Sequence, residues 1–311
     1  MLPPRPAFAL NTDASLLGSA AAAAAAGQQY PAATLYVVAT PIGNRADITL
    51  RAIHVLALVD AVACEDTRVT GALLHHLGLH KPLIALHQHN EQAAAVQVID
   101  RLAQGQRVAY ASDAGTPAIS DPGALLVAAV AARGHRVLPL PGPSSAAAAL
   151  SVAGDAAASG FAFHGFLPTK GRERQAALAV VLAAPGQSQV LFEAPHRIEE
   201  LFSTLAQAAS TRRVTVCREL TKQFESVATL PAAELPAWLA ADANRGRGEF
   251  VLVIHAAAAA AVSDALPASA LATLAVLLRE LPLKQAVALA AEISGAPRNA
   301  LYQHALAQRG D

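Results

Sequence analysis

The sequence predicts an α/β protein of two α/β domains followed by a small helical domain, and three observations lead to this prediction. From Leu35 onward, short apolar or β-branched runs alternate with helical patterns, as parallel strands and their crossover helices do. The alternation pauses at the turn Pro141–Ser145 and resumes at Phe161. A polyalanine stretch, Ala256–Ala261, then precedes three short helical segments. The predicted domains are residues 34–145, 146–258 and 263–311.

The first series of patterns predicts five strands joined by four helices. A polar cluster follows several of the strands, at the edge where an open parallel sheet binds its ligands. The predicted strands are 35–40, 61–64, 83–86, 108–111 and 137–140, and the predicted helices are 48–58, 69–77, 92–103 and 124–132.

The second series predicts a mixed sheet. Strand patterns lie near Phe161–Phe166, Gln189–Phe192, Arg213–Arg218 and Glu249–His255. A further run, Glu225–Leu230, is expected to be an antiparallel addition to this sheet.

The last fifty residues predict three short helices. The segments Pro267–Leu281, Lys284–Ile293 and Arg298–Ala307 are separated by a Leu-Pro break and a Ser-Gly-Ala-Pro break. This pattern resembles a helix-turn-helix appendage. Because the segment has few basic residues, a helical cap or dimer contact without a nucleic-acid role is an equal alternative.

The amino-terminal segment, residues 1–33, is expected to be a flexible tail, because it has neither the features of a secretion signal nor a periodic helical face. The apolar runs Ala20–Ala26 and Ala256–Val262 are too short to span a bilayer, so no membrane association is expected. Cys64 and Cys217 lie far apart in strand patterns, unlike a disulfide framework, which favours a reducing cytoplasm.

The charge of the chain gives no general signal for a polyanionic partner. The chain has 23 basic and 23 acidic residues, so as a whole it lacks the strongly basic balance that indicates binding to a polyanion. Any RNA site must therefore be local.

The end of the second predicted strand, Cys64–Arg68, places two carboxylates and a guanidinium at one sheet edge. Glu65 or Asp66 can accept a proton from a hydroxyl, and Arg68 can hold a phosphate or pair with a carboxylate. The alternative is structural: Asp66 or Thr67 caps the next helix and Arg68 forms an ion pair.

The third predicted strand ends in His87–Glu91. Alternate histidines face the same way on a strand, but no third ligand of suitable spacing accompanies them, so no metal site is expected. We expect this cluster, including His89 and Asn90, to form hydrogen bonds to RNA or to the neighbouring carboxylates, while Glu91 can simply begin a helix.

The most specific stretch is Ala111–Gly123, a long loop that follows a strand and carries small residues, two aspartates and two Pro-linked turns. Small side chains leave backbone groups free to hold a ligand, and Asp113 can accept from an amine or a ribose hydroxyl. The strand-end turns at Ala39–Asn44 and Pro141–Ser145 offer backbone to the same ligand, although each also fits a plain structural turn.

Loops of the second domain carry a local group of cations that suits phosphate contacts, with a solvated surface as the alternative. These residues are Lys170, Arg172, Arg174, Arg197, Arg218 and Lys222.

The ordered set of motifs resembles the tetrapyrrole methylase superfamily and, within it, members that methylate small-subunit ribosomal RNA. The similarity covers everything from about Leu35 through the last helices. The motifs, in order, are ATPIGNRADIT, ACEDTR, HQHNEQ, SDAGTPAISDPG, PLPGPSS, GFLPTKG, FEAPHRI, RELTK and GEFVL.

This resemblance implies a homodimer whose two α/β domains bind S-adenosylmethionine in an interdomain cleft. It also implies 2′-O-methylation of a decoding-centre cytidine in 16S ribosomal RNA, with free RNA or the assembled 30S subunit as substrate. Tyr110 and Arg45 depart from the motifs, which usually carry aliphatic or apolar residues there. The implied cofactor residues are Pro41, Ser112, Asp113, Ile119, Ser144, Ser145, and Phe192 or Glu193.

We predict Glu65 or Asp66 as the general base, with Lys222 as an electrostatic helper, and contacts to RNA from Arg68, His89, Asn90, Arg197 and Arg218. Two other functions stay open at this point. One is carbon methylation of a tetrapyrrole by the same fold and cofactor site, and the other is a non-enzymatic ribosome-assembly protein that binds RNA through its terminal helices.

Overall fold

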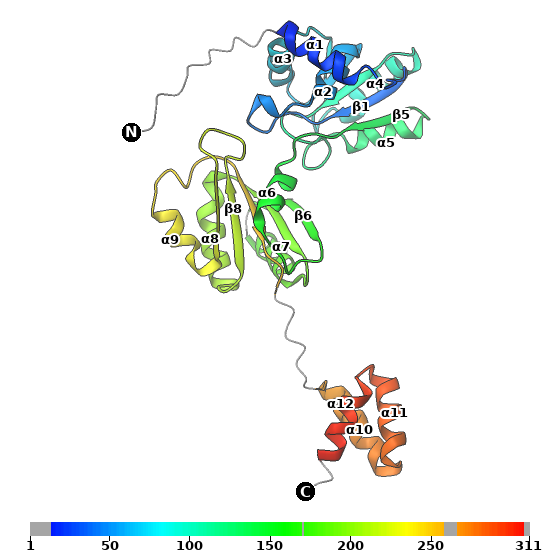
Figure 1. The fold of residues 1–311 in the computed structure, drawn as a ribbon, viewed down its shortest axis with the longest axis vertical. Helices are drawn as coiled ribbons and strands as arrows, with labels where there is room; N and C mark the ends of the chain where they lie inside the picture. The colour runs from blue at the N-terminus through cyan, green and yellow to red at the C-terminus, as the bar shows by residue number, and fades with distance from the viewer. Residues whose placement is uncertain (1–13, 170, 258–265, 308–311) are drawn as a thin grey trace. The chain divides into compact units, whose positions relative to one another are not determined.

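The computed structural model describes residues 14–169, 171–257 and 266–307 (Figure 1). Both sheets belong to one compact unit that ends at His255, and the helices after Ala256 form a second unit. The described residues contain no helix that is both long and apolar enough to cross a membrane.

The first sheet is parallel throughout, in the order β3-β2-β4-β1-β5. The predicted strands are confirmed to within one or two residues at each end. The strands are β1 (Thr34–Val38), β2 (Ala61–Cys64), β3 (Leu83–Ala85), β4 (Val108–Ala111) and β5 (Arg136–Leu140).

Helices cover both faces of this sheet, which explains why its strands are apolar on both sides. Tyr36 and Val38 of β1 face the core beneath α2 and α3, whereas Leu35 faces the core beneath α4 and α5. The helices are α2 (Leu50–Leu58), α3 (Thr67–His76), α4 (Glu91–Ala103) and α5 (Ala124–Ala132).

The predicted flexible tail is wrong for part of its length, because Ala14–Ala25 forms helix α1, which packs on α2. Ala21 and Ala25 are buried, and Leu17 packs on the same core, so the contact recurs every four residues. An alanine stripe within an alanine-rich segment gives almost no contrast in hydrophobicity, which hides the helical period from the sequence.

The second sheet is mixed, as predicted, in the order β6-β7-β10-β8-β9. Strand β10 runs antiparallel to both neighbours, and the predicted antiparallel addition is β9, paired with β8. The strands are β6 (Phe161–Phe166), β7 (Ser188–Glu193), β8 (Arg213–Arg218), β9 (Ser226–Pro231) and β10 (Phe250–Ile254).

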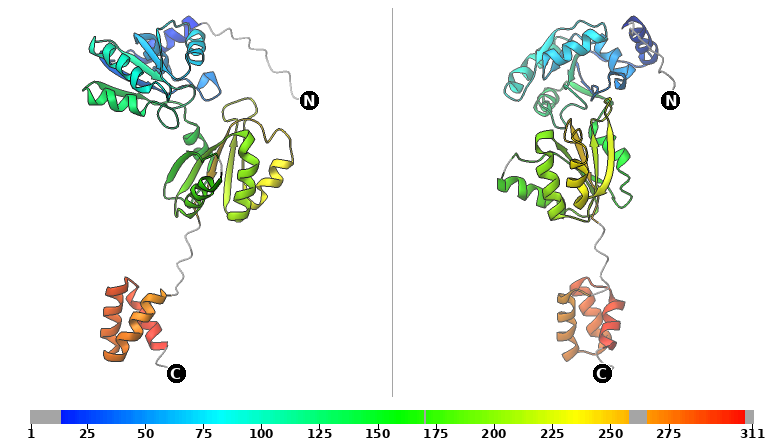
Figure 2. Two further views of the ribbon diagram at one scale, coloured as in Figure 1. Left: turned by 180° about the vertical axis from the view of Figure 1, so that it is seen from behind. Right: turned by 90° about the vertical axis from the view of Figure 1, so that its left-hand side faces the viewer.

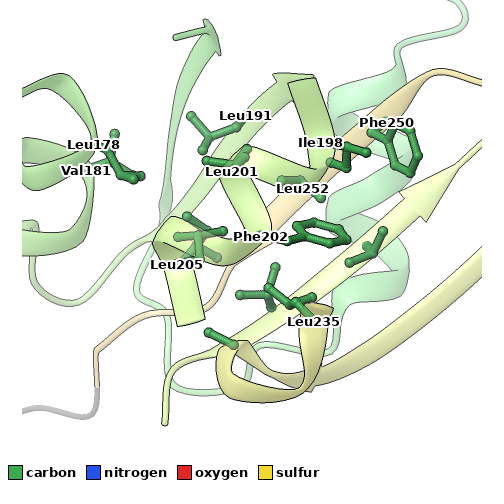
Figure 3. Packing of buried hydrophobic residues seen from close by; sticks show 14 of the residues in the cluster. Leu178, Val181, Leu191, Ile198, Leu201, Phe202, Leu205, Leu235, Phe250 and Leu252 are labelled. Atoms are coloured by element: carbon green, nitrogen blue, oxygen red, sulfur yellow. The ribbon is translucent and has the colours of Figure 1, made fainter. Parts of the chain in front are cut away.

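Helices also cover both faces of the second sheet, as the edge-on view in Figure 2 shows. Phe250 and Leu252 point into a core with α8 and α9, and Figure 3 shows Phe202 at its centre. Val251 and Val253 of the same strand pack on the other face against α6. The helices are α6 (Ser145–Ala153), α7 (Gly171–Ala183), α8 (Ile198–Ala208) and α9 (Leu235–Ala240), with 3₁₀ turns η1 (Arg45–Asp47), η2 (Pro195–Arg197) and η3 (Ala232–Glu234).

The second unit is a bundle of three short helices, α10 (Ala268–Glu280), α11 (Leu283–Ser294) and α12 (Arg298–Ala307), close to the three predicted bounds. Gly295 ends α11 in the left-handed conformation with φ of 69°, as the Ser-Gly-Ala-Pro break predicts. Leu274, Val287 and Leu301, one from each helix, meet in its core.

Candidate active site

Three of the predicted motifs meet at the carboxyl edge of the first sheet. Thr40 and Gly115 exchange two backbone hydrogen bonds, of 2.9 and 3.0 Å. The Thr40 hydroxyl donates to the carbonyl of Ser112 at 3.0 Å, and the Thr116 hydroxyl donates to the carbonyl of Pro143 at 3.0 Å. The loop after β4 is therefore tied to the loops after β1 and β5.

The far end of the Ser112–Gly123 loop is fixed by Glu91, Tyr110 and Gly123. The Glu91 carboxylate, buried at the start of α4, accepts backbone hydrogen bonds from Gly123, Leu125 and Leu126 at 2.8, 3.0 and 3.2 Å, capping α5. The Tyr110 hydroxyl donates to the carbonyl before Gly123. Gly123 has φ of 122°, and a Cβ there would lie 2.2 Å from the Tyr110 ring, so only glycine fits.

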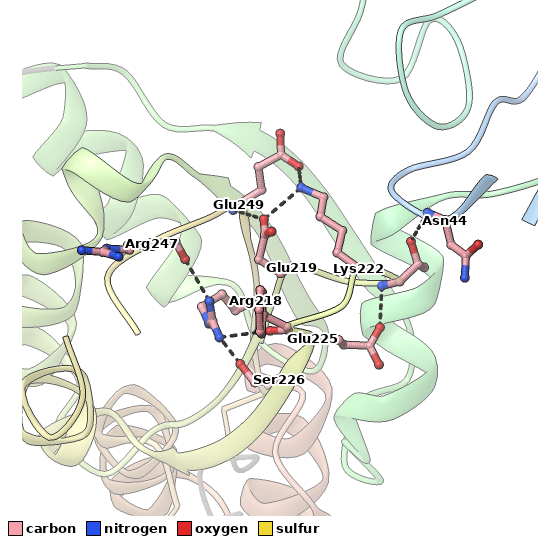
Figure 4. Close-up of polar contacts among 10 residues, drawn as sticks. Asn44, Arg218, Glu219, Lys222, Glu225, Ser226, Arg247 and Glu249 are labelled. Atoms are coloured by element: carbon pink, nitrogen blue, oxygen red, sulfur yellow. Dashed lines mark hydrogen bonds and ion pairs between the residues drawn. The ribbon is translucent and has the colours of Figure 1, made fainter. Parts of the chain in front are cut away.

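The second sheet contributes a cluster of one lysine and two glutamates, drawn in Figure 4. Lys222 Nζ lies 2.9 Å from Glu219 Oε1 and 2.8 Å from Glu249 Oε2. Burial lowers the pKa of Lys222, but its hydrogen bonds to the two carboxylates outweigh that effect and raise the pKa, so the side chain stays charged.

A direct contact joins this cluster to the first sheet. The Asn44 backbone N–H donates to the Thr221 hydroxyl at 3.0 Å (Figure 4). Gly43 lies so close that a Cβ there would stand 2.5 Å from Lys222 Cγ. Because Gly43 has no side chain, the loop that carries Thr221 and Lys222 can approach the turn after β1 this closely.

Three cavities lie where the two sheets' loops meet. The first, the Phe-lined cavity, has about 390 Å³ and includes Phe166, Phe192 and Phe250. A small annex of about 60 Å³ includes Ile119. The third, the Lys222 cavity, has about 450 Å³ and includes Arg45.

All eight residues predicted to bind a cofactor line these cavities. Ser145, Phe192 and Glu193 line the Phe-lined cavity, Ile119 and Ser144 line the annex, and Pro41, Ser112 and Asp113 line the Lys222 cavity. The Phe-lined cavity is an apolar space with three phenylalanine rings, which suits a nucleoside. The carboxylate and the many backbone groups next to it suit the charged tail that the nucleoside carries. The residues present therefore fit S-adenosylmethionine.

Of the two alternatives Phe192 and Glu193, the structure favours Phe192 as the side chain that meets a ligand. The Glu193 side chain has no exposed surface and pairs with Arg174 at 2.7 Å and Arg197 at 3.0 Å. Its carboxylate is thus committed to the protein, and only its backbone can serve a ligand.

The two predicted bases differ in environment. Asp66 caps α3 by accepting from Arg68 N at 2.8 Å and pairs with the Arg68 guanidinium, and these bonds lower its pKa to about 2. Burial, followed by the nearby carboxylates of Asp113, Asp121 and Asp66, raises the pKa of Glu65. In the described structure neither side chain lines the three cavities.

The residues predicted to contact RNA also divide. The Arg68 side chain is 89% exposed and His89 is exposed, so both are accessible. Asn90 Oδ1 accepts from His87 N at 2.8 Å and its Nδ2 donates to Ala85 O at 2.9 Å. Asn90 therefore shapes the turn before α4.

The expected phosphate contacts of three arginines are not supported. Arg174 is 5% exposed and bound to Glu193. Arg197, with a side chain 13% exposed, pairs with Glu193 and donates to Leu167 O at 2.7 Å. Arg218 donates to Ser226, Phe224 and Arg247 at 3.0 to 3.2 Å. Each of the three holds loops together, and Lys170 lies outside the described residues.

Cys64 and Cys217 are both buried and free. Within the described residues, no group of three or more histidine, cysteine or carboxylate side chains is arranged to hold a metal ion.

The sequence does not predict the roles of two site residues. It indicates Glu91 only as the start of a helix, because the partners of this carboxylate lie more than thirty positions away. It indicates Glu249 only as the beginning of a strand, although this residue lines two of the cavities. The only available signal for Glu249 was its place in the motif GEFVL.

Two family models match the chain. The model described as "Tetrapyrrole (Corrin/Porphyrin) Methylases" matches residues 34–236. The model described as "RsmI C-terminal HTH domain" matches residues 264–309.

Several bacterial proteins are similar along nearly their whole length, and each is named "Ribosomal RNA small subunit methyltransferase I". The protein of Escherichia coli O157:H7 is 49% identical over 277 residues, which is 89% of this chain and 96% of that protein. The protein of Vibrio cholerae is 47% identical over 89% of this chain and 96% of its own length. The protein of Pseudomonas aeruginosa is 47% identical over 90% of this chain and 99% of its own length.

Solved structures share the fold at low identity. Uroporphyrin-III-C-methyltransferase from Thermus thermophilus has a TM-score of 0.51 and 19% identity, covering 71% of this chain and 94% of that chain. A diphthine synthase has a TM-score of 0.52 and 15% identity, covering 71% and 90%.

Proposed function

We propose that this chain, which belongs to the tetrapyrrole methylase family, methylates small-subunit ribosomal RNA with S-adenosylmethionine. The acceptor is the 2′-hydroxyl of a decoding-centre cytidine in 16S rRNA. One observation carries the proposal: relatives named for methylation of small-subunit ribosomal RNA match about nine-tenths of this chain and almost all of their own length, at 47–49% identity.

The cavities support the cofactor half of the proposal. One solved relative of this fold, a uroporphyrin-III C-methyltransferase, is described as a complex with S-adenosyl homocysteine. In this chain, Phe192 and Ser145 would hold the adenosine part in the Phe-lined cavity. Asp113, in the Lys222 cavity, would accept a hydrogen bond from the amine or from a ribose hydroxyl.

When bound, S-adenosylmethionine supplies a methyl group on a cationic sulfur, which is already a good electrophile. The protein must therefore mainly align that methyl with the acceptor oxygen and take the hydroxyl proton. Alignment can account for about 7–11 kcal/mol of barrier lowering. A positioned base contributes about 10²–10⁴-fold, so the geometry of the cleft should matter most.

The RNA half of the proposal rests on accessible side chains of the first domain, on one arginine of the Lys222 cavity and on the second unit. Arg68 and His89 are exposed, and Arg45 lines the Lys222 cavity. The second unit matches the model of a helix-turn-helix domain, which supports a role for it in holding RNA. We further propose that the enzyme works in the cytoplasm as a homodimer, on free rRNA or on the assembled 30S subunit.

An acceptor panel tests the proposal. Purified protein and labelled S-adenosylmethionine are incubated separately with unmodified small subunits, with free small-subunit rRNA and with a uroporphyrinogen-type tetrapyrrole. Incorporation into an RNA acceptor, lost in Asp113→Ala, is the expected result. Incorporation into the tetrapyrrole alone would contradict the RNA assignment. Tight RNA binding without incorporation, unchanged in Asp113→Ala, would indicate a non-enzymatic assembly protein.

A further inference from the structure

We propose that Glu249 is the catalytic residue that accepts the proton of the acceptor hydroxyl, in place of the predicted Glu65 or Asp66. This inference rests on the proposed function, because it assumes transfer of a methyl group to a hydroxyl. It is carried by the position of Glu249 between two cavities and by the cluster that holds its carboxylate.

The border between the two large cavities is where the reacting atoms must meet. Ile42, Ala114 and Glu249 line both the Phe-lined cavity and the Lys222 cavity. If the adenosine part lies among the phenylalanines and Asp113 holds the amine, the sulfur between them comes to this border. The Lys222 cavity, of about 450 Å³ and with Arg45 at its wall, leaves room for a nucleotide carrying a phosphate.

Glu249 is held in place yet accessible, as a base that meets a substrate must be. Its side chain is 80% exposed, and Lys222 Nζ binds its Oε2 at 2.8 Å (Figure 4). The second carboxylate, Glu219, is 20% exposed and accepts from both Lys222 Nζ and the Glu249 backbone N–H, each at 2.9 Å. Glu219 thus fixes the lysine, and the lysine fixes Glu249.

The backbone around this cluster is strained. Glu219 has φ of 53° and Thr221 has φ of 65°, a conformation that a β-branched residue rarely adopts. Gly248 has φ of 87°, and a Cβ there would lie 2.4 Å from Glu219 Cγ. Strained backbone of this kind gathers at functional sites, which agrees with a loop shaped to present Lys222 and Glu249.

The other carboxylates of the cavities are less well placed. Glu193 is fully buried between two arginines. Asp113 Oδ1 accepts from the Asp66 backbone N–H at 3.0 Å and lines only the Lys222 cavity. Asp121 lines the Phe-lined cavity and the annex. Glu249 alone among the described carboxylates lines both large cavities.

The step balances without any further reactant. The acceptor oxygen forms a bond to the methyl carbon while the carbon–sulfur bond breaks and its electron pair stays on sulfur, which loses its positive charge. The hydroxyl proton moves to the Glu249 carboxylate, which becomes neutral. Lys222 keeps its charge throughout and orients the carboxylate.

The test is single-turnover methylation of unmodified small subunits by wild type and by Glu249→Gln, with saturating S-adenosylmethionine. Glutamine keeps an oxygen for Lys222, so the loop should stay in place while the base is lost. The matched control is Glu234→Gln, an exposed glutamate of the same domain whose side chain makes no helix-capping hydrogen bond and lines none of the three cavities in the described structure. Glu65→Gln and Asp66→Asn are measured beside them.

We expect Glu249→Gln to slow methyl transfer by about 100-fold or more and the control by less than about threefold. Calorimetric affinity for S-adenosylmethionine and filter-binding affinity for the subunit should stay within about twofold of wild type. The residual rate of Glu249→Gln should rise about tenfold per pH unit, because hydroxide then removes the proton, whereas the wild-type rate levels off.

Two results would overturn the inference alone: an active wild type with Glu249→Gln within about tenfold of it, or a loss of rate matched by an equal loss of cofactor or subunit affinity. A larger loss in Glu65→Gln than in Glu249→Gln would return the role to Glu65. A wild type that transfers no methyl to the RNA would instead refute the proposed function, and the inference would fall with it.

Discussion

Replacing Glu91 by alanine tests how the ligand-binding loop is held, because one buried carboxylate oxygen accepts three backbone N–H groups at the start of α5. A hydrogen bond to a charged group contributes about 1.5–3 kcal/mol, and a lost helix cap costs about 0.5–2 kcal/mol. The three donors share one oxygen, so their contributions do not add fully. We expect Glu91→Ala to lower the free energy of unfolding by about 2–4 kcal/mol.

The assay is urea unfolding followed by circular dichroism, with the midpoint read at constant slope. Glu91→Gln keeps the acceptor but removes the charge that favours the helix N-terminus, and should cost only about 1 kcal/mol. Gln92→Ala, exposed on the same turn of α4, is the matched control and should lie within about 0.5 kcal/mol of wild type. If Glu91→Ala also fell within that margin, the cap would have no energetic role.

Three further changes are predicted. Gly123→Ala should lower the free energy of unfolding by about 3 kcal/mol or more, because it adds a clash with the Tyr110 ring to an unfavourable φ. Gly134→Ala, with φ of 76° and open space around it, should lower it by only about 1–2 kcal/mol. Thermal unfolding of both variants measures the difference, and equal losses would contradict the clash. Arg174→Met should cost about 3 kcal/mol in urea unfolding, since it leaves the buried Glu193 with one arginine instead of two, and a neutral result would show that Arg197 suffices. Burial lowers the pKa of His255, so the unfolded chain binds a proton more tightly than the folded one. The free energy of unfolding should therefore fall as the pH drops below about 6.5. In His255→Gln, the urea midpoint should depend less on pH between pH 5 and 7.5 than it does in wild type.

The strands were predictable because their signal is local. Runs such as Val108–Ala111 are apolar on both faces, as a central parallel strand requires, and each is bounded by turn residues. Helix α1 was not predictable, since its buried stripe is made of the same alanine as most of its surface. The period of a helix can be read only where buried and exposed positions differ in chemistry.

The location of the site was predictable for the same reason, but the partners of its charged residues were not. Strand-end motifs come together at one edge of a parallel sheet whatever the rest of the chain does, which placed Ser112 and Asp113 in the cavities. Whether an arginine such as Arg197 faces phosphate or a buried glutamate depends on side-chain packing. No pattern of spacing in the sequence encodes that choice.

The most direct test of the central claim is the identity of the methylated nucleoside. Small subunits lacking the modification are incubated with the protein and with S-adenosylmethionine labelled in the methyl group. The RNA is then digested to nucleosides, which are analysed by chromatography and mass spectrometry. We predict label in a 2′-O-methylated cytidine from the decoding centre. Label on a base carbon or nitrogen, or no label from a protein that binds the cofactor, would contradict it.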